Sequence, residues 1–243
     1  MKYIAFLLLL ISSYAHSKNV DKILDSVDRL YRSDTTFSSI EMKIKTPNWD
    51  RTLDMDVWTK GLLYTFVVIK NPIKDKGIAT LKRENNMWNF FPKINKVIKI
   101  PPSMMMSSWM GSDFTNDDLV KENTFRDDYK AELTLEDKEN YYISLTPKQQ
   151  TISIWGKIEL IVHKKMLYPI KQTYYDENGE KIRTMVFDEI KKVESKTIPM
   201  RMTLTPHTKE KEGHETIILY KEIKFNPEIS DSTFTRRNLQ KRR

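Results

Sequence analysis

The chain has 243 residues, a formal net charge of +8 and no cysteine. Without cysteine it cannot form disulfides, use a thiol in catalysis or bind a metal through cysteine, and no lipid anchor on a cysteine sulfur is expected. A basic surface favours negatively charged partners, such as lipid headgroups or an acidic protein face. Nucleic acid is not expected as a partner, because the basic residues are scattered and form no aromatic-spaced basic motif.

Residues 1–17 are typical of a cleavable secretory signal. A lysine near the start is followed by an unbroken apolar run over residues 4–11 and by small residues before a cut at Lys18. The run is too short to span a bilayer, and no other stretch is apolar enough to do so. The alternative interpretation is a short buried helix at the N-terminus. We expect residues 18–243 to form one soluble, exported domain of the cell envelope that is large enough to bury its own core.

An amphipathic helix is predicted over residues 20–31. Its apolar residues recur at helical spacing and form one stripe. Asp21, Asp25, Asp28 and Arg29 are expected on the opposite, exposed face. The stripe consists of Val20, Ile23, Leu24, Val27, Leu30 and Tyr31.

Most of the remaining chain is predicted to form β-strands. Leu53, Met55 and Val57 alternate with polar residues, which is typical of a sheet with one wet face. Asn178-Gly179 is a strong hairpin signal. Short turns separate the strands and few helices intervene, which favours one long, curved antiparallel sheet. Further strands are expected near residues 62–69, 78–81, 87–91, 94–100, 129–135, 141–145, 158–163, 170–175, 182–187, 200–204 and 216–220.

The segment Pro101 to Val120 interrupts this pattern and is predicted to form a helical insert. Ser103 is expected to cap a first short helix that Gly111 ends, and Thr115 a second. The first helix would carry an unusual cluster of methionines, a flexible side chain suited to surfaces that accept different apolar shapes. A lid over a cavity and ordinary packing against the sheet are both consistent with this pattern.

No constellation of residues points to catalysis, a metal or a cofactor. His207 and His214 flank a loop and could face each other, but no third zinc ligand is evident, and exposed loop histidines are the simpler interpretation. Gly111-Ser112-Asp113 lacks the strand-to-helix elbow of serine hydrolases. We therefore expect no catalytic residue, no metal site and no cofactor. The basic run 236–243 is predicted to be a solvated tail.

Several strings resemble the outer membrane lipoprotein-sorting proteins of the LolA/LolB-like superfamily. The most specific runs from Ser108 to Leu119 and includes Trp-Met-Gly-Ser-Asp-Phe-Thr-Asn-Asp-Asp. The others are Trp88-Asn89-Phe90-Phe91-Pro92, Ile100-Pro101-Pro102-Ser103-Met104-Met105, Tyr168-Pro169-Ile170, Tyr175-Asp176, Gly179 and Arg237-Asn238-Leu239.

The resemblance implies an incomplete antiparallel barrel, mainly β, with an apolar cavity that the N-terminal helix and the insert cover. It also implies a soluble periplasmic carrier without catalysis. The cargo would be the acyl chains of lipoproteins or another envelope lipid, received from an inner-membrane exporter and delivered to an outer-membrane acceptor. Transient contact with a membrane surface is compatible with the basic charge. Two alternatives remain open: a periplasmic interaction or scaffold module with a filled core, and an envelope lipid hydrolase that uses His207 and His214.

Side chains alternate between the two faces of a strand, and this alternation, with position in the insert, suggests which side chains would line such a cavity. A one-residue error in parity would turn a strand's side chains to the opposite face. The residues expected to bind lipid are Leu53, Met55, Val57, Trp88, Phe90, Met104, Met105, Met106, Trp109, Met110 and Phe114.

Overall fold

The computed structural model describes residues 20–121, 125–151 and 153–241. The predicted signal, residues 1–17, lies outside these described residues. Thirteen strands form one antiparallel sheet in the order β6-β5-β4-β3-β2-β1-β13-β12-β11-β10-β9-β8-β7. They are β1 (Thr35–Lys45), β2 (Asp50–Lys60), β3 (Tyr64–Asn71), β4 (Ala79–Arg83), β5 (Asn86–Phe91), β6 (Lys96–Lys99), β7 (Tyr129–Glu136), β8 (Asn140–Pro147), β9 (Lys157–His163), β10 (Pro169–Tyr175), β11 (Lys181–Val193), β12 (Lys196–Pro206) and β13 (Glu215–Phe225).

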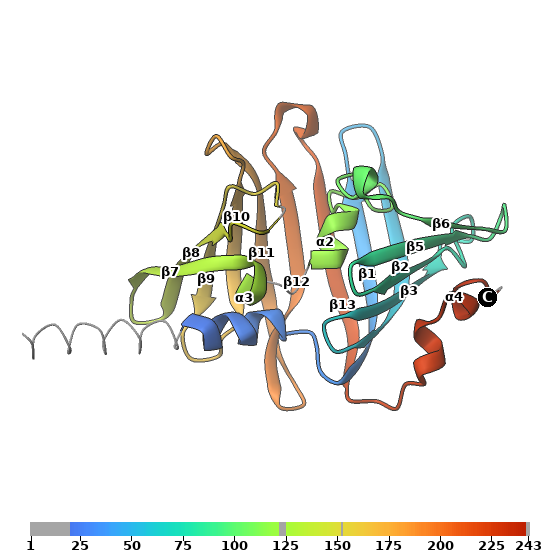
Figure 1. Ribbon diagram of the computed structural model, residues 1–243, viewed down its shortest axis with the longest axis horizontal. Coiled ribbons are helices and arrows are strands. Elements are labelled where there is room, and N and C mark those ends of the chain that lie inside the picture. Colours follow the sequence, from blue (N-terminus) through green and yellow to red (C-terminus); the bar gives the residue numbers. More distant parts are fainter. Residues whose placement is uncertain (1–19, 122–124, 152, 242–243) are drawn as a thin grey trace, which may run out of the picture.

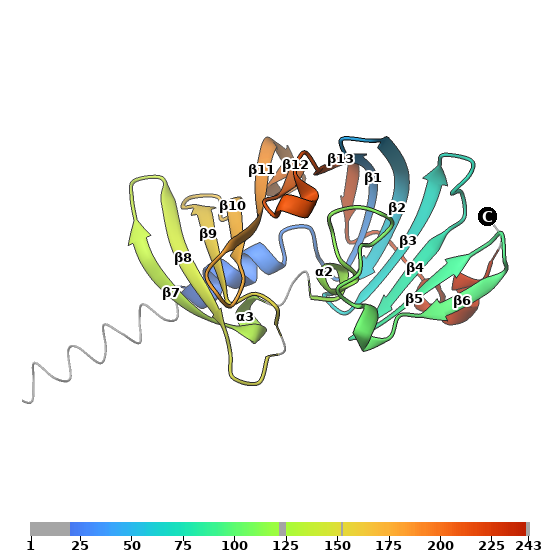
Figure 2. The same cartoon turned by 90° about the horizontal axis from the view of Figure 1, so that it is seen from above.

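The sheet is strongly curved, and its edge strands β6 and β7 lie at opposite ends without pairing (Figures 1 and 2). The N-terminal helix (residues 20–28), α2 (Asn116–Lys121) and α3 (Phe125–Asp128) lie on its concave side. The 3-10 helix η3 (Asp231–Phe234) and α4 (Arg236–Leu239) lie on the outside, next to β3 and β4. This arrangement confirms the predicted incomplete barrel, mainly β, with few helices.

Alternating burial along the strands places one apolar row on the concave face. On β1 the residues at every second position are buried, and on β2 Leu53 and Met55 are fully buried while Val57 is half-buried. Strand β3 is instead buried on both faces. Val67 packs on the concave side and Phe66 on the convex side, because each face of this strand is covered by a different segment.

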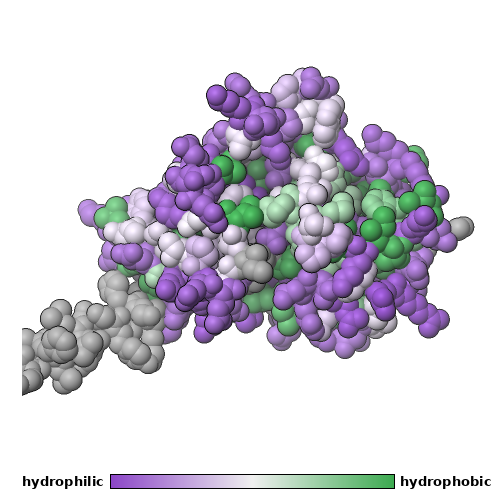
Figure 3. All heavy atoms as spheres, turned by 45° about the horizontal axis from the view of Figure 1, so that its top comes forward, coloured by the Kyte–Doolittle hydropathy of each residue, from purple (hydrophilic) through white to green (hydrophobic). Residues whose placement is uncertain are grey.

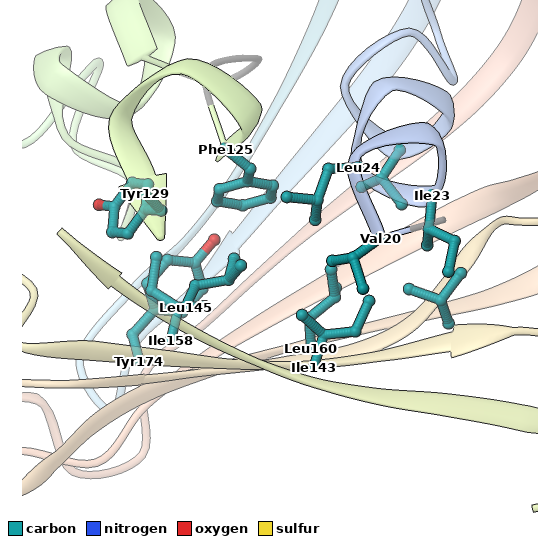
Figure 4. Packing of buried hydrophobic residues seen from close by; sticks show 12 residues of the cluster. Val20, Ile23, Leu24, Phe125, Tyr129, Ile143, Leu145, Ile158, Leu160 and Tyr174 are labelled. Carbon is teal, nitrogen blue, oxygen red and sulfur yellow. The ribbon is translucent and has the colours of Figure 1, made fainter. Parts of the chain in front are cut away.

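The N-terminal helix packs its apolar stripe on strands β8 and β9. Figure 4 shows Val20 and Leu24 above Ile143 and Leu160. The helix is shorter than the predicted 20–31. After Asp28 the backbone tightens, since the N–H groups of Leu30 and Arg32 donate to carbonyls only three residues back. The chain thereby turns toward β1, and Leu30 and Tyr31 continue the stripe outside the helix.

The insert contains less helix than predicted. Its first part is a single 3-10 turn, η1 (Pro102–Met104), with no side-chain cap from Ser103. Residues 105–113 then reverse direction through Met110 and Gly111, both with positive φ, and Ser108 pairs with Thr115. This reversal is incompatible with the continuous helix expected through Met110. The second helix, α2, is capped as predicted, because the Asp118 N–H donates to the Thr115 hydroxyl at 3.1 Å.

The C-terminal segment covers the convex face of β3 to β5. Phe234 and Leu239 are buried there, and they pack with Phe66, Leu81 and Phe90. The prediction of a solvated tail over 236–243 is therefore wrong for residues 236–239, which form α4. The apolar Leu239 within the basic run provides the anchor that charge alone did not reveal.

Replacing Phe234 with alanine should lower the free energy of unfolding by about 3–5 kcal/mol, because truncation of a buried aromatic leaves a cavity. Urea unfolding followed by tryptophan fluorescence would measure the change. Ile73→Ala is the control, since this side chain is 88% exposed and its truncation should have little effect. An unchanged midpoint for Phe234→Ala would show that the C-terminal segment does not contribute to the folded core.

Candidate functional site

A cavity of about 180 Å³ lies between the concave face of the sheet and the segments that cover it. Most of its lining is aliphatic or aromatic, as in sites for hydrophobic ligands. The apolar side chains come from the N-terminal segment, the insert, α3 and both halves of the sheet. They are Val27, Leu30, Tyr31, Ile40, Val57, Val67, Trp109, Phe114, Leu119, Phe125, Tyr129, Trp155, Ile158, Met185, Phe187, Met202, Ile218 and Tyr220.

Several polar side chains in the wall bond to other protein groups, whereas the buried Thr59 hydroxyl, which also lines the cavity, has no hydrogen-bond partner among the described residues. Arg32 is 4% exposed and donates from Nη1 to the Thr65 hydroxyl at 3.0 Å. The Tyr174 hydroxyl donates to Oε1 of Gln172 at 2.7 Å. Because these groups have protein partners, they do not oppose an apolar occupant as strongly as unpaired polar groups would.

Trp109 fixes the insert to the sheet. Its side chain is 5% exposed and its indole N–H donates to the Thr80 hydroxyl at 3.2 Å. That hydroxyl in turn donates to Oδ1 of Asn89 at 2.7 Å. This short chain of buried hydrogen bonds gives the insert a specific position on the sheet, together with the hydrogen bonds between Asp113 and Thr216 and from Arg51 to the Met110 carbonyl.

An ion pair connects α2 to β11. The Arg183 guanidinium donates to both oxygens of Asp118, at 2.7 Å and 2.5 Å, and it lies 4.4 Å and 4.3 Å from the ring centroids of Trp155 and Tyr174. Burial raises the pKa of Asp118, but the charge and hydrogen bonds of Arg183 outweigh it and hold the pKa below its usual value. The pair is therefore ionised and largely shielded from water, with the Arg183 side chain 5% exposed.

A second buried carboxyl group, that of Asp28, connects the N-terminal helix to α3 through hydrogen bonds. Its carboxyl accepts the backbone N–H groups of Phe125 at 3.3 Å and Arg126 at 3.2 Å. Burial raises the pKa of Asp28 to about 7, although these two hydrogen bonds oppose the shift, and the charges of Asp127 and Asp25 add to it. Asp28 was expected on the exposed face of the helix. It follows Leu24 by four residues, however, and so lies on the buried stripe.

The structure brings only part of the predicted lining together. Val57, Trp109 and Phe114 reach the cavity. Four more of the predicted residues lie in a neighbouring cluster between the insert and strands β1 to β3. Two further predicted residues are exposed on the outside of the insert. The clustered residues are Leu53, Met55, Met105 and Met110, and the exposed ones are Met104 and Met106.

Trp88 and Phe90 lie on the convex face, in the cluster that includes Phe234. Strand β5 is apolar on both faces, so its parity could not be read from the sequence, and Met87 is the side chain that packs on the concave side. The aromatic and sulfur-containing residues of β11 to β13 that line the cavity were missed for a related reason. They lie in ordinary alternating strands, with no local signal that distinguishes cavity from core.

The two histidines have separate partners. His207 Nε2 is 2.8 Å from the Thr184 hydroxyl, and His214 Nδ1 is 3.6 Å from the buried carboxylate of Asp113. Within residues 20–121, 125–151 and 153–241, no group of three or more potential ligands could hold a metal ion. Nor does any helix in the described part of the chain have the length and apolar character needed to cross a membrane.

Replacing Arg183 with methionine should lower the free energy of unfolding by about 3–5 kcal/mol, because it leaves the Asp118 carboxylate buried without its counter-charge. The double variant Arg183→Met, Asp118→Leu should recover much of this loss, since neither charge then remains. Calorimetry of four proteins measures the coupling: the natural chain, the single variants Arg183→Met and Asp118→Leu, and the double variant. Equal losses in the single and double variants would contradict the assignment.

Asp28 should make the protein less stable as pH rises. Its folded-state pKa of about 7 exceeds the ordinary value of 3.8, so the folded state binds the proton more tightly and loses stability between about pH 4 and pH 7. Asp28→Asn should remove this component and be more stable than the natural chain at about pH 8. Asp21→Asn, at an exposed position of the same helix, is the control for thermal unfolding across this range. Parallel pH profiles for the natural chain and Asp28→Asn would refute the prediction.

The fold matches several solved structures over most of their length. A DUF1329 family protein from Desulfovibrio piger has 21% identity and a TM-score of 0.82, with 92% of this chain and 98% of that chain covered. A putative outer membrane lipoprotein-sorting protein domain from Vibrio parahaemolyticus has 19% identity and a TM-score of 0.77, covering 93% and 97%. A LolA superfamily protein from Nitrosomonas europaea has 21% identity and a TM-score of 0.73, covering 89% and 97%.

No curated protein matches the chain at a significant level. A family model described as "Uncharacterized protein" matches residues 61–241, which is most of the chain and includes the insert and the cavity-lining strands β11 to β13. The chain therefore belongs to the family of that model, and it has the fold of LolA superfamily proteins and of outer membrane lipoprotein-sorting domains.

Proposed function

We propose that this protein is a periplasmic lipid carrier that holds acyl chains in the covered cavity and moves them toward the outer membrane. The observation that carries the proposal is the apolar cavity between the curved sheet and its three covering segments. The likeness to a lipoprotein-sorting domain supports lipoprotein acyl chains as the cargo, with another envelope lipid as the alternative. Residues 18–243 form the carrier domain, and residues 1–17 direct its export.

The physical need for a carrier follows from the cost of exposing hydrocarbon to water. Each methylene contributes about 0.8 kcal/mol, so one long acyl chain costs on the order of 10 kcal/mol in water. A lipid with two or three chains therefore does not cross an aqueous compartment at a useful rate alone. A concave apolar sheet whose covering segments can open provides a nonpolar environment that shields the acyl chains from water while the protein diffuses.

The cover opens without a chemical step in this proposal. Its polar contacts with the sheet include Trp109 on Thr80, Asp113 on Thr216 and Asp118 on Arg183, and Asp28 joins the N-terminal helix to α3. Each can be broken while the sheet stays intact. Uptake from an inner-membrane exporter and release to an outer-membrane acceptor then need differential binding alone, and no catalytic residue.

The two alternatives have less support. An interaction module with a filled core does not need a cavity of about 180 Å³ beneath its helices. A hydrolase that uses His207 and His214 would need them to act together, but they contact Thr184 and Asp113 respectively. The carrier accounts for the cavity and for its apolar lining at once.

Leu119→Lys should weaken binding of a fluorescent fatty acid by about tenfold or more, because the side chain lines the cavity and a lysine would place a charge in it. Met104→Lys is the matched control on the same insert, since Met104 is 48% exposed outside the cavity. Native mass spectrometry before and after organic extraction would identify any lipid that co-purifies. A natural chain that carries no lipid and binds no fatty acid would refute the carrier.

A further inference from the structure

A second apolar depression, the outer groove, lies beside the insert and has a volume of about 330 Å³. Met106 of the insert, Ile154 and Trp155 before β9, Ile182 of β11 and Leu204 of β12 contribute its apolar wall. Met106 is 41% exposed and Ile154 is 38% exposed, so hydrocarbon here faces solvent. Figure 3 shows apolar atoms gathered along the middle of this side of the molecule between hydrophilic margins.

Three charged side chains of the outer groove, Asp113, Asp176 and Arg183, each have bonds to other protein groups. Asp113 accepts the Thr216 hydroxyl at 2.8 Å and lies 3.1 Å from Lys211 Nζ. Asp176 accepts backbone N–H groups of its own turn, and Arg183 is paired with Asp118. The surface that remains to be covered is therefore hydrocarbon, and its natural complement is another hydrocarbon.

Only one layer of side chains separates the outer groove from the cavity. Trp155 lines both, Arg183 lines the groove, and its ion-pair partner Asp118 lines the cavity. The Trp155 ring lies 4.4 Å from the Arg183 guanidinium, so these three residues form one partition. A small rotation of Trp155 or separation of the ion pair would join the two spaces.

The volume of the cavity indicates why a second space is needed. An apolar cavity of about 150 Å³ is filled by a molecule the size of benzene. The cavity of about 180 Å³ is of the same order, so a long acyl chain has methylenes left over that must be covered elsewhere.

We propose that the outer groove is a second hydrocarbon-binding site, which holds the part of a long acyl chain that the cavity does not accommodate. The inference rests on the proposed function and adds a chain-length selectivity to it. The distal end of the chain lies in the cavity, passes the partition at Trp155 and continues along Met106, Ile154 and Ile182. A short acyl chain fits in the cavity and does not use the outer groove.

The test compares palmitate with hexanoate, which is close to benzene in carbon number, by displacement of a fluorescent fatty acid. Ile154→Asp should weaken palmitate binding by about tenfold and leave hexanoate binding unchanged, and Met106→Asp should act in the same way. Both side chains are substantially exposed, so these variants should fold, which circular dichroism would check. Leu135→Asp on β7 is the control and should affect neither ligand, because Leu135 is 59% exposed and lines neither the groove nor the cavity.

The outcomes separate this inference from the carrier function. If the natural chain binds both acids and the groove variants leave palmitate unchanged, the outer groove is refuted and the carrier stands. If the groove variants weaken both acids equally, the selectivity is refuted. If the natural chain binds neither acid, both proposals fail together.

Discussion

A strongly curved antiparallel sheet has a concave face that no single helix can cover, and the rest of this structure follows from that constraint. The N-terminal helix, the insert with α2, and α3 come from separate parts of the chain and cover this face together. They do not fill the space under the sheet, which leaves the cavity. The hydrophobic effect keeps each segment on the sheet but is not directional. The polar contacts therefore fix the position of each segment.

Two buried carboxylates show how differently such contacts can behave. Asp118 lies against a guanidinium that keeps its pKa low, whereas Asp28 accepts backbone N–H groups near two other acids, and burial raises its pKa to about 7. The contact of α2 with the sheet is therefore insensitive to pH near neutrality, while the contact of the N-terminal helix with α3 changes charge there. One cover segment is thus held by an ion pair, and the other by a carboxyl group whose charge changes near neutral pH.

The sheet, its antiparallel order and the insert could be predicted from the sequence, because alternation and turn residues are local signals. Asn178-Gly179 and the Thr115 cap are examples, and both are present. The candidate site could be predicted less well from the sequence. Whether Trp88 or Met87 faces the concave side depends on the C-terminal segment, which is distant in sequence and covers the other side of β5. The partners of Asp28 and Arg183 are likewise long-range, and no spacing in the sequence indicates them.

An incomplete barrel also leaves two strands with one unpaired side, and exposed edges invite other chains to add strands. Here β6 is only four residues long and carries Lys96 and Lys99, and β7 presents Lys130, Glu132 and Glu136 along a largely exposed length. A short edge and repeated charges both discourage edge-to-edge association. The open barrel therefore leaves space for a cavity on the concave face, and it also creates two edges that must not pair with other copies of the chain.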